Sequence, residues 1–499
     1  MHERTIAELG RLLAAREITS QDLVSRYKGR FERIDRAGNL RSILEINQEA
    51  EEIAAALDGE RERGSLRGPL HGIPILLKDN IDTADRMETT AGSLALLGSK
   101  PKEDATVAAR LRAAGALLLG KANMSEWANF RSTHSTSGWS ARGEQCRNPY
   151  DLNLTPCGSS SGSGAAVSAD IAPAALGTET DGSILCPAAI CGIVGIKPTV
   201  GLTSRAGVIP ISHTQDTIGP MTRTVEDAAL LLGVIAGPDP RDEATKASEG
   251  RVHPDYTQFL IEEGLRGARI GVPREFHFGT SPEADAAAEA AIEEMRRLGA
   301  IIVDPADIPT SQEQADSPAE MEVLHYEFKA DLNAYLQTRP DARVHSLADL
   351  IRFNEEHADE ELRHFGQEIF LQAEEKGPLT ETAYLEARAT SRRLAGEEGI
   401  DAVMRRHRLD ALVMPTQGLP WPINYETGDK PNGHSSAGPA ARAGYPAITV
   451  PSGFAGALPL GITFMGTAFS EPTLIRLAYS FEQATHHRRP PSIAGLESR

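Results

Sequence analysis

Helix-like and strand-like segments alternate along almost the whole chain, and this alternation limits the possible folds more than any other feature of the sequence. A helical pattern over 106–114 is followed at once by the apolar run 116–119. A second unit has strand candidates at 268–272 and 300–303, on either side of a helical pattern over 283–298. Alternating helices and strands pack as a sheet covered by helices, so the sequence predicts an α/β fold.

Three strand candidates come late in the chain, at 411–414, 447–450 and 461–465, after a long helical stretch over 317–408. Isolated strands leave backbone N–H and C=O groups without partners, so these late strands are easiest to place if they return to one sheet. We therefore expect a single large mixed β-sheet core covered by helices on both faces, in one domain that spans 1–499. The length of 499 residues would by itself also allow two or three domains.

Charge and hydropathy argue against several classes of protein. The chain has 51 Lys and Arg against 70 Asp and Glu, so its net charge of -19 repels phosphate backbones and anionic lipids. We expect no nucleic-acid partner, and no membrane partner because no apolar run approaches the ~18 residues of a membrane span. The N-terminal segment reads as an amphipathic helix without the apolar core of a secretory signal, which favours a cytoplasmic protein. A secreted form trimmed of its signal would look the same.

The cysteines and histidines form no recognisable cross-link or metal motif. Four cysteines in 499 residues are too few for a disulfide scaffold, and no C-x-x-C pair occurs among them. We therefore expect reduced, partly buried thiols. The sequence also lacks H-E-x-x-H and other His and Cys clusters at ligand spacing, so no metal is expected. The four cysteines are Cys146, Cys157, Cys186 and Cys191.

A run of glycine and serine, Cys157-Gly-Ser-Ser-Ser-Gly-Ser-Gly164, leads directly into an apolar, helix-like segment over 165–169. Glycine lets the backbone approach a ligand closely, while serine supplies hydroxyls and N–H groups at the start of a helix. A flexible linker would not be followed at once by an apolar helix, and a phosphate-binding loop would need G-K-[ST], which is absent. Both of these explanations are therefore weakened.

A second glycine-rich turn lies between apolar segments and contains Thr180-Asp-Gly-Ser183. Such a turn could point the backbone N–H groups of Thr180, Asp181, Gly182 and Ser183 at one spot, which is what a developing oxyanion requires. Ser183 is therefore a candidate nucleophile.

The apolar run Ile73-Pro-Ile-Leu-Leu77 ends in a single lysine, Lys78, and apolar residues resume at Ile81. Lysine is rarely buried unless it is paired, so Lys78 either marks the exposed end of a strand or has a special role. If it is buried, its pKa falls, and the neutral amine can act as a general base near neutral pH.

These three segments, together with several others, resemble the amidase signature family. The block from Cys157 to Thr199 matches the signature of that family, and the resemblance covers nearly the whole chain. It implies one amidase signature domain, with an N-terminal helical segment over 1–65, a catalytic core over 66–240 and the remaining sheet and pocket elements over 241–499. Further similar blocks are Gly120-Lys-Ala-Asn-Met-Ser-Glu-Trp127, Gln215-Asp-Thr-Ile-Gly-Pro-Met221 and Gly444-Tyr-Pro-Ala-Ile-Thr-Val-Pro451.

The resemblance also implies a Ser-Ser-Lys catalytic triad that works without histidine, metal or organic cofactor. The lysine of the family's G-I-P-hydrophobic-K-D-N strand corresponds to Lys78, and the relay serine, the first of the paired serines in G-S-S, corresponds to Ser159. The nucleophile, in G-S-I after the G-T-[DE] turn, corresponds to Ser183. The residues expected to support these groups are Ser160, Thr178 and Glu179.

Within the family, the chain is most similar to bacterial peptide amidases, which remove the C-terminal amide of peptides. The basis is the turn Gly177-Thr-Glu-Thr-Asp-Gly-Ser183, together with 125–131 and 324–329. The chain departs from the common pattern at Asp181, often Gly in the family, and at Leu185, often Arg. We therefore expect an amidase for small-molecule or peptide amides, active as a monomer or homodimer, with Asp181 at the substrate. Further pocket candidates, which could equally be core aromatics, are Trp127, Phe130, Trp421 and Tyr445.

Other functions remain compatible with the sequence. Gly158-Ser-Ser-Ser-Gly162 fits G-x-S-x-G, which would make Ser160 the nucleophile of an α/β-hydrolase. That fold needs a buried strand just before the motif, whereas 150–156 are polar and include proline. The chain could instead be the amidase subunit of an amidotransferase, which shares the same signature and delivers ammonia to a partner. A non-catalytic binding protein is disfavoured because all three triad positions are occupied.

Overall fold

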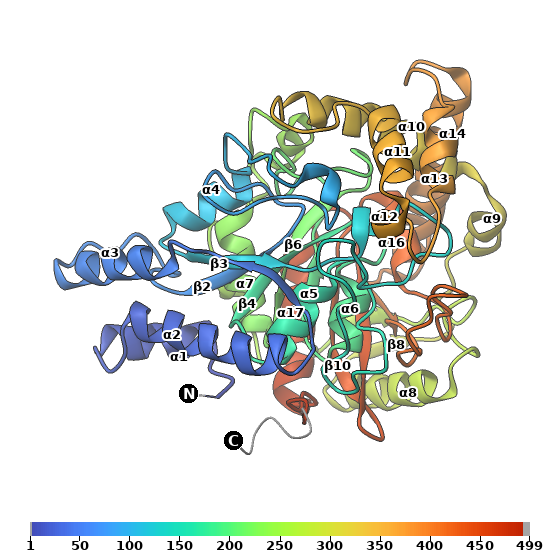
Figure 1. Cartoon of the computed structure of the whole chain (residues 1–499). Coiled ribbons are helices and arrows are strands. Elements are labelled where there is room, and N and C mark those ends of the chain that lie inside the picture. Colours follow the sequence, from blue (N-terminus) through green and yellow to red (C-terminus); the bar gives the residue numbers. More distant parts are fainter. Residues whose placement is uncertain (1, 493–499) are drawn as a thin grey trace.

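The computed structural model describes residues 2–492 and is built around one sheet of 11 strands (Figure 1). The strand order is β1-β3-β2-β4-β6-β5-β10-β11-β9-β7-β8, so early and late strands meet in the same sheet. Residues 1 and 493–499 of the expected domain lie outside the described part. The strands are β1 (Ile43–Ile46), β2 (Pro74–Lys78), β3 (Leu117–Ala122), β4 (Ala174–Glu179), β5 (Val194–Lys197), β6 (Thr217–Thr222), β7 (Arg269–Gly271), β8 (Ile301–Val303), β9 (Ala411–Pro415), β10 (Ala447–Ala455) and β11 (Leu458–Met465).

The sheet is mixed, as the sequence predicted. β2 pairs in parallel with β3 and β4, and β7 pairs in parallel with β8 and β9. The other neighbouring strands are antiparallel. The late strands β9, β10 and β11 return to the sheet between β5 and β7, which confirms the expectation drawn from the long helical stretch before them.

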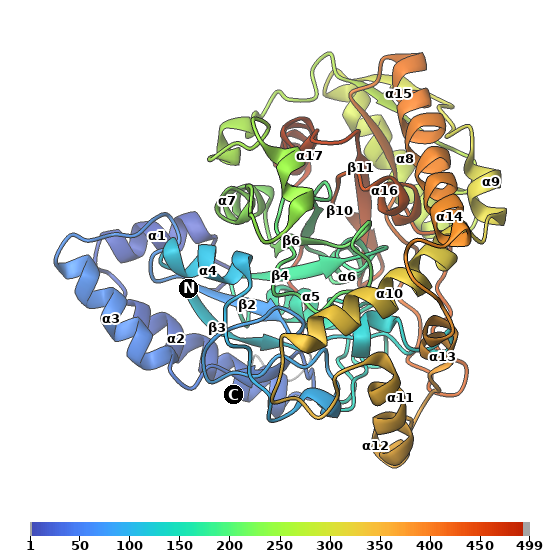
Figure 2. The same cartoon turned by 90° about the horizontal axis from the view of Figure 1, so that it is seen from above.

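Helices cover both faces of the central strands (Figure 2). On one face, α5 (Ser161–Ser168) and α6 (Leu185–Ile190) contact each other and the sheet. On the opposite face, α7 (Val225–Ile235) and α17 (Glu471–Thr485) do the same. All residues of α5 and α6 are buried, so these two helices belong to the core. Both follow directly on the serine-containing loops, which are thereby fixed against the sheet.

Two further helices confirm patterns read from the sequence. α4 (Thr106–Ala113) packs on β3 and α7, and α8 (Pro282–Arg297) packs on β9, β10 and β11 while it connects β7 to β8.

Among residues 2–492, no helix combines the length and the apolarity that crossing a membrane requires. Short 3-10 helices lie at Leu94–Leu96, Glu126–Asn129, Glu243–Ser248 and Tyr256–Phe259.

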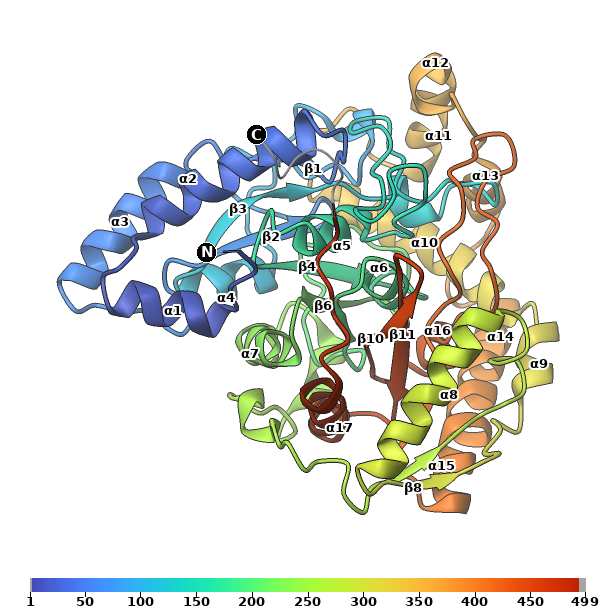
Figure 3. The same ribbon diagram turned by 90° about the horizontal axis from the view of Figure 1, so that it is seen from below.

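The N-terminal helices extend from the part of the sheet that contains β2 and β3 (Figures 1 and 3). The buried residues of the first helix, Ile6, Leu9 and Leu13, recur on one helical face. Thr5 and Thr19 each form a capping box with the acidic residue three positions later, so side chains fix both helix starts. These elements are α1 (Ile6–Ala14), α2 (Ser20–Arg30), a π-helix over Phe31–Arg36 and α3 (Ala50–Glu62).

A second group of helices lies on the side of the molecule away from α1, α2 and α3 (Figure 1). Its longest helix buries Phe328 and Leu332, together with Phe370 and Trp127, in a hydrophobic cluster separate from the main core. The elements are α9 (Ser311–Asp316), α10 (Ala319–Gln337), α11 (Leu347–Glu356), α12 (Ala358–Glu361), α13 (Glu368–Glu374), α14 (Thr382–Arg392), a π-helix over Arg393–Ile400, α15 (Asp401–His407) and α16 (Ala437–Ala443).

Candidate active site

Lys78 ends strand β2 and is completely buried. Its exposure is 0%, so it does not mark the exposed end of a strand. The Nζ atom lies 2.7 Å from Ser159 Oγ and 2.8 Å from Thr178 Oγ1, within hydrogen-bond distance of both. Because β2 pairs with β4, which carries Thr178, two neighbouring strands and the serine loop meet at this amine.

The environment of Lys78 favours the neutral amine. Burial lowers the pKa of Lys78 to about 7, well below the usual value of a lysine. The carboxylates of Asp216 and Glu179 act in the opposite direction, because they stabilise the charged ammonium. A substantial fraction of the amine is therefore neutral near pH 7 and able to accept a proton from the Ser159 hydroxyl.

The first two serines of the loop before α5 have different hydrogen-bond partners. Ser159 and Ser160 are both fully buried, and Ser159 Oγ is the atom that contacts Lys78. Ser160 Oγ donates a hydrogen bond to the Thr178 carbonyl, 3.0 Å away, and accepts one from the Thr178 N–H. These two bonds hold the Ser160 side chain on the backbone of β4.

Ser183 lies in the turn between β4 and α6. Gly182 has a φ of +80°, in the left-handed region that favours glycine. The buried Glu179 accepts hydrogen bonds from the Ile184 and Leu185 N–H groups at 2.6 and 2.9 Å, which fixes the turn from inside. Ser183 is 8% exposed, whereas Ser159 is fully buried, so Ser183 is the more accessible of the two serines.

The backbone of this turn is available to a developing oxyanion. Within residues 2–492, the N–H groups of Asp181 and Ser183 donate no hydrogen bond to the protein. The Ser183 carbonyl accepts from the Ser160 N–H at 3.1 Å, which joins the turn to the serine loop. In the same described part of the chain, the Ser183 hydroxyl makes no hydrogen bond to Ser159. The structure thus contains the contact between Lys78 and Ser159 but not the second contact of the expected triad.

Comparison with known proteins identifies the family. The model of the family described as Amidase matches residues 22–475. The chain belongs to the amidase family. A probable amidase from Arabidopsis thaliana is 44% identical and aligns with 98% of this amidase and 92% of its own chain.

A solved structure and a second relative are also similar to this amidase, and they have different functions. The native peptide amidase from Stenotrophomonas maltophilia has a TM-score of 0.94 and 51% identity, over 99% of both chains. The predicted amidase signature fold is therefore confirmed. The glutamyl-tRNA(Gln) amidotransferase of Moorella thermoacetica contains a subunit that is 36% identical over 98% of both chains.

Two polar side chains that hold the site of the amidase were not assigned from the sequence. Asn80 Nδ2 donates to Thr178 Oγ1 at 3.0 Å, the same hydroxyl that contacts Lys78. Asp216 accepts a hydrogen bond from Thr180 Oγ1 at 2.6 Å, and its charge acts on Lys78. Both residues stand inside blocks that resemble the family, and this is the signal that could have found them.

The loop that carries Asp216 is anchored to the neighbouring elements. Gln215 Nε2 donates to the Thr180 carbonyl at 3.3 Å. His213 Nδ1 lies 2.8 Å from Asp331 in α10, and although burial opposes its charge, this carboxylate raises the pKa of His213. His213, Asp331 and Glu327 have ligand atoms within 4.8 Å of one another, a grouping that sequence spacing did not reveal. These side chains bond to the loop and to one another, so we interpret them as its anchor.

Two of the four candidate pocket aromatics lie on the α10 side of the amidase. Trp127 lines a small cavity together with Thr178 and Thr180, next to the lysine. Phe130 packs edge to face on Phe328, with ring centroids 5.1 Å apart, in the hydrophobic cluster under α10. Trp127 is thus beside the site, whereas Phe130 contributes to the core behind it.

Each of the two remaining aromatic candidates donates a hydrogen bond to an aspartate. Trp421 is buried, and its indole N–H donates to Asp429 at 2.9 Å. The Tyr445 hydroxyl donates to Asp401 in α15 at 2.8 Å, so this side chain is engaged in packing between helices. Asp181, at the nucleophile turn, has an exposed side chain and is open to a ligand.

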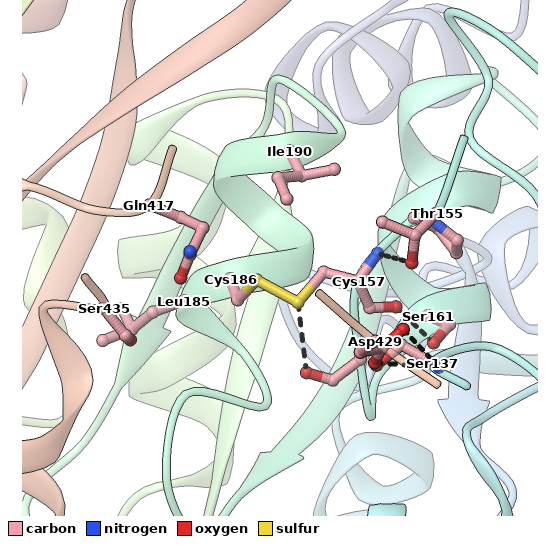
Figure 4. Close-up of a disulfide and its surroundings, with 12 residues drawn as sticks. Ser137, Thr155, Cys157, Ser161, Leu185, Cys186, Ile190, Gln417, Asp429 and Ser435 are labelled. Carbon is pink, nitrogen blue, oxygen red and sulfur yellow. Dashed lines mark hydrogen bonds between the residues drawn. A yellow bond between two sulfur atoms is a disulfide. The ribbon is translucent and has the colours of Figure 1, made fainter. Parts of the chain in front are cut away.

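Cys157 and Cys186 form a disulfide, so the expectation of reduced thiols was wrong for this pair (Figure 4). Their Cα atoms lie 6.0 Å apart because the serine loop packs against the start of α6. The spacing of the cysteines gave no sign of this contact, which exists only in the folded chain. Cys146 and Cys191 are free, buried thiols, as expected.

Proposed function

We propose that this amidase hydrolyses the C-terminal amide of peptides, with Ser183 as nucleophile, Ser159 as relay and Lys78 as base. The observation that carries the proposal is the 2.7 Å contact between the buried Lys78 amine and Ser159 Oγ. Similarity to a solved peptide amidase supports the choice of substrate.

The first half of the cycle forms a tetrahedral intermediate on Ser183. Neutral Lys78 accepts the proton of Ser159, and Ser159 accepts that of Ser183 while Ser183 Oγ attacks the carboxamide carbon. This step requires the Ser183 hydroxyl to turn toward Ser159. The carbonyl oxygen gains negative charge and is bound by backbone N–H groups of the turn, those of Thr180, Asp181, Gly182 and Ser183.

The second half releases both products. The Lys78 ammonium returns its proton through Ser159 to the leaving nitrogen, ammonia departs, and an ester remains on Ser183. Water then attacks the ester carbon and gives a proton through Ser159 to Lys78. The bond from the carbonyl carbon to Ser183 Oγ breaks, Ser183 takes the proton back through Ser159, and the acid leaves as its carboxylate while Lys78 is neutral again. The cycle uses no histidine, metal or organic cofactor. The exposed Asp181 side chain can accept a hydrogen bond from a backbone N–H of the peptide through a carboxyl oxygen.

A second candidate function is that of the ammonia-producing subunit of an amidotransferase. Similarity to the subunit of a glutamyl-tRNA(Gln) amidotransferase favours it. Such a subunit would act on glutamine within a larger assembly, whereas a peptide amidase works as an isolated chain. The two functions therefore differ in substrate and in the need for a partner.

Ammonia release from a panel of amides tests the substrate class. We expect the isolated chain to hydrolyse peptide amides with a kcat/KM at least about tenfold above that for aryl amides, short aliphatic amides and free glutamine. A peptide with a C-terminal carboxylate and a glutamine side chain is the matched control, because its only primary carboxamide, the group that can release ammonia, lies off the main chain. A chain that is inert alone, elutes in a large assembly and acts on glutamine would instead be an amidotransferase subunit.

The rate is expected to rise with pH through about 7, because burial lowers the pKa of the Lys78 base to that value. Below this pH the ammonium cannot accept the Ser159 proton, so kcat/KM is lost as pH falls, and above it kcat/KM reaches a plateau. Asp216→Asn removes a carboxylate that stabilises the ammonium. This variant should therefore move the rise of kcat/KM with pH, which we call the acidic limb, to lower pH. The pH dependence of kcat/KM measures the shift.

Asp227→Asn is the control for the pH profile. Asp227 is buried as well, and burial raises its pKa to about 7. This carboxylate, however, accepts the Ile6 N–H in the N-terminal segment. Its removal should leave the limb in place. Lys78 would not be the base if the limb were absent, or if it moved with Asp227→Asn and not with Asp216→Asn.

A further inference from the structure

The disulfide joins the two segments that carry the proposed serines (Figure 4). Cys157 precedes Ser159 by two positions, and Cys186 follows Ser183 by three. The bond therefore closes a covalent loop that contains both serines, whereas Lys78 enters the site from a separate strand.

Within residues 2–492, a single hydrogen bond joins the serine loop directly to the nucleophile turn. The Ser160 N–H donates to the Ser183 carbonyl at 3.1 Å. Ser160 Oγ bonds to Thr178, which lies on β4 before the turn, and Glu179 ties the turn to the first residues of α6. The disulfide is thus the one covalent connection across the two segments, and it lies close to both serines in sequence.

The surroundings of the disulfide also bear on its role. It packs with Ile190 and Trp421 in a small cluster, and Asp429 holds the Trp421 indole through a 2.9 Å hydrogen bond. Both bridged cysteines retain 6% exposure, whereas the free thiols Cys146 and Cys191 are at 0%. The bridged cysteines are therefore buried, but slightly less completely than the free thiols.

We propose that the Cys157–Cys186 disulfide is a positioning cross-link for amide hydrolysis, which fixes the turn of Ser183 against the loop that carries Ser159. The inference rests on the proposed triad and assigns a role to a bond that touches neither substrate nor reacting atoms. Displacing a reacting group by about 1 Å can lower a rate by about a hundredfold. A disulfide that served only stability would instead alter unfolding but not the turnover of the folded enzyme.

Reduction of the folded amidase tests this role. Dithiothreitol supplies two electrons and two protons to the bond, which becomes two thiols, and is itself oxidised to its cyclic disulfide. Below the unfolding temperature of the reduced protein, we expect kcat for a peptide amide to fall about tenfold or more, with KM within about twofold. Reoxidation should restore kcat. The acidic limb near pH 7 should persist, because the contact between Lys78 and Ser159 is untouched.

Variants and a spectroscopic signal sharpen the test. Cys157→Ser combined with Cys186→Ser should show the low kcat of the reduced protein and no response to dithiothreitol. Cys146→Ala removes a buried free thiol and should keep both the kcat and the response. A disulfide quenches the fluorescence of an adjacent indole, so Trp421 emission should rise on reduction and Trp421→Phe should abolish that change. If the double variant does not fold, reduction and reoxidation of the natural chain still test whether the disulfide affects kcat.

Two results would overturn the inference. One is a folded, reduced protein that shows the emission change and keeps kcat within about twofold. The other is a loss of kcat that reoxidation does not reverse, which would indicate a structural role alone. A failure of the proposed triad would give a different result. The Ser183→Ala variant would then be fully active while its disulfide is closed.

Discussion

Ser183→Ala is expected to lower kcat for a peptide amide by roughly 10,000-fold or more, because no acyl-enzyme can form. The fold should persist, since Glu179 and the left-handed Gly182 hold the turn without help from the serine hydroxyl. Steady-state ammonia release measures the loss, and circular dichroism with thermal unfolding checks the fold.

Two neighbouring serines make this test specific. Ser163 Oγ donates to the Leu176 carbonyl at 3.0 Å, so Ser163→Ala removes a comparable buried hydroxyl and should leave kcat within about threefold. Ser160→Ala should weaken catalysis through the loss of its bonds to Thr178, but by less than Ser183→Ala. An enzyme that Ser160→Ala inactivates and Ser183→Ala spares would be a hydrolase with Ser160 as nucleophile.

Lys78→Met is expected to lower kcat by about 1,000-fold or more, in the range found when a general base is removed. Methionine fills a similar volume without an amine, so the apolar packing around β2 should be kept. Any residual activity should lack the acidic limb near pH 7. Ammonia release across the pH range measures both effects.

Lys121→Met is the matched control for the lysine. Lys121 lies on the neighbouring strand β3 with 0% exposure, and burial lowers its pKa to about 8. Its amine contacts Thr89 Oγ1 at 2.9 Å instead of a serine of the site. The control should lower the free energy of unfolding and leave kcat within about threefold. Equal losses in both variants, or an undiminished rate in Lys78→Met, would remove Lys78 from the role of base.

Sequence periodicity predicted the layers of this fold but not the order of its strands. The patterns over 106–114 and 283–298 became α4 and α8 almost unchanged, because each of these helices buries a regular apolar face. The place of β5 between β6 and β10 depends on how distant segments pack, and no local pattern encodes it. The β10–β11 hairpin is longer than predicted, because pairing continues past a bulge near Gly453, where the apolar pattern is interrupted.

The candidate catalytic residues came from family resemblance more than from the residues themselves. Lys78 and Ser159 are 81 positions apart and meet only in the folded chain, where β2 and β4 are neighbours. Without the resemblance, the segment around Lys78 slightly favoured an exposed strand end. Asp216 was missed because its role is to act on Lys78 through space, which leaves no local spacing to recognise.

The covalent link beside the two serines bears on where such an enzyme can work. Cytosolic glutathione and thioredoxin keep most cysteines reduced, whereas a periplasm or an extracellular space lets cystines persist. The cytoplasmic location expected from the N-terminal sequence is therefore at odds with the bond between Cys157 and Cys186. An amidase whose serines depend on this bond would reach its full rate only in oxidising surroundings, and entry into a reducing compartment would slow it.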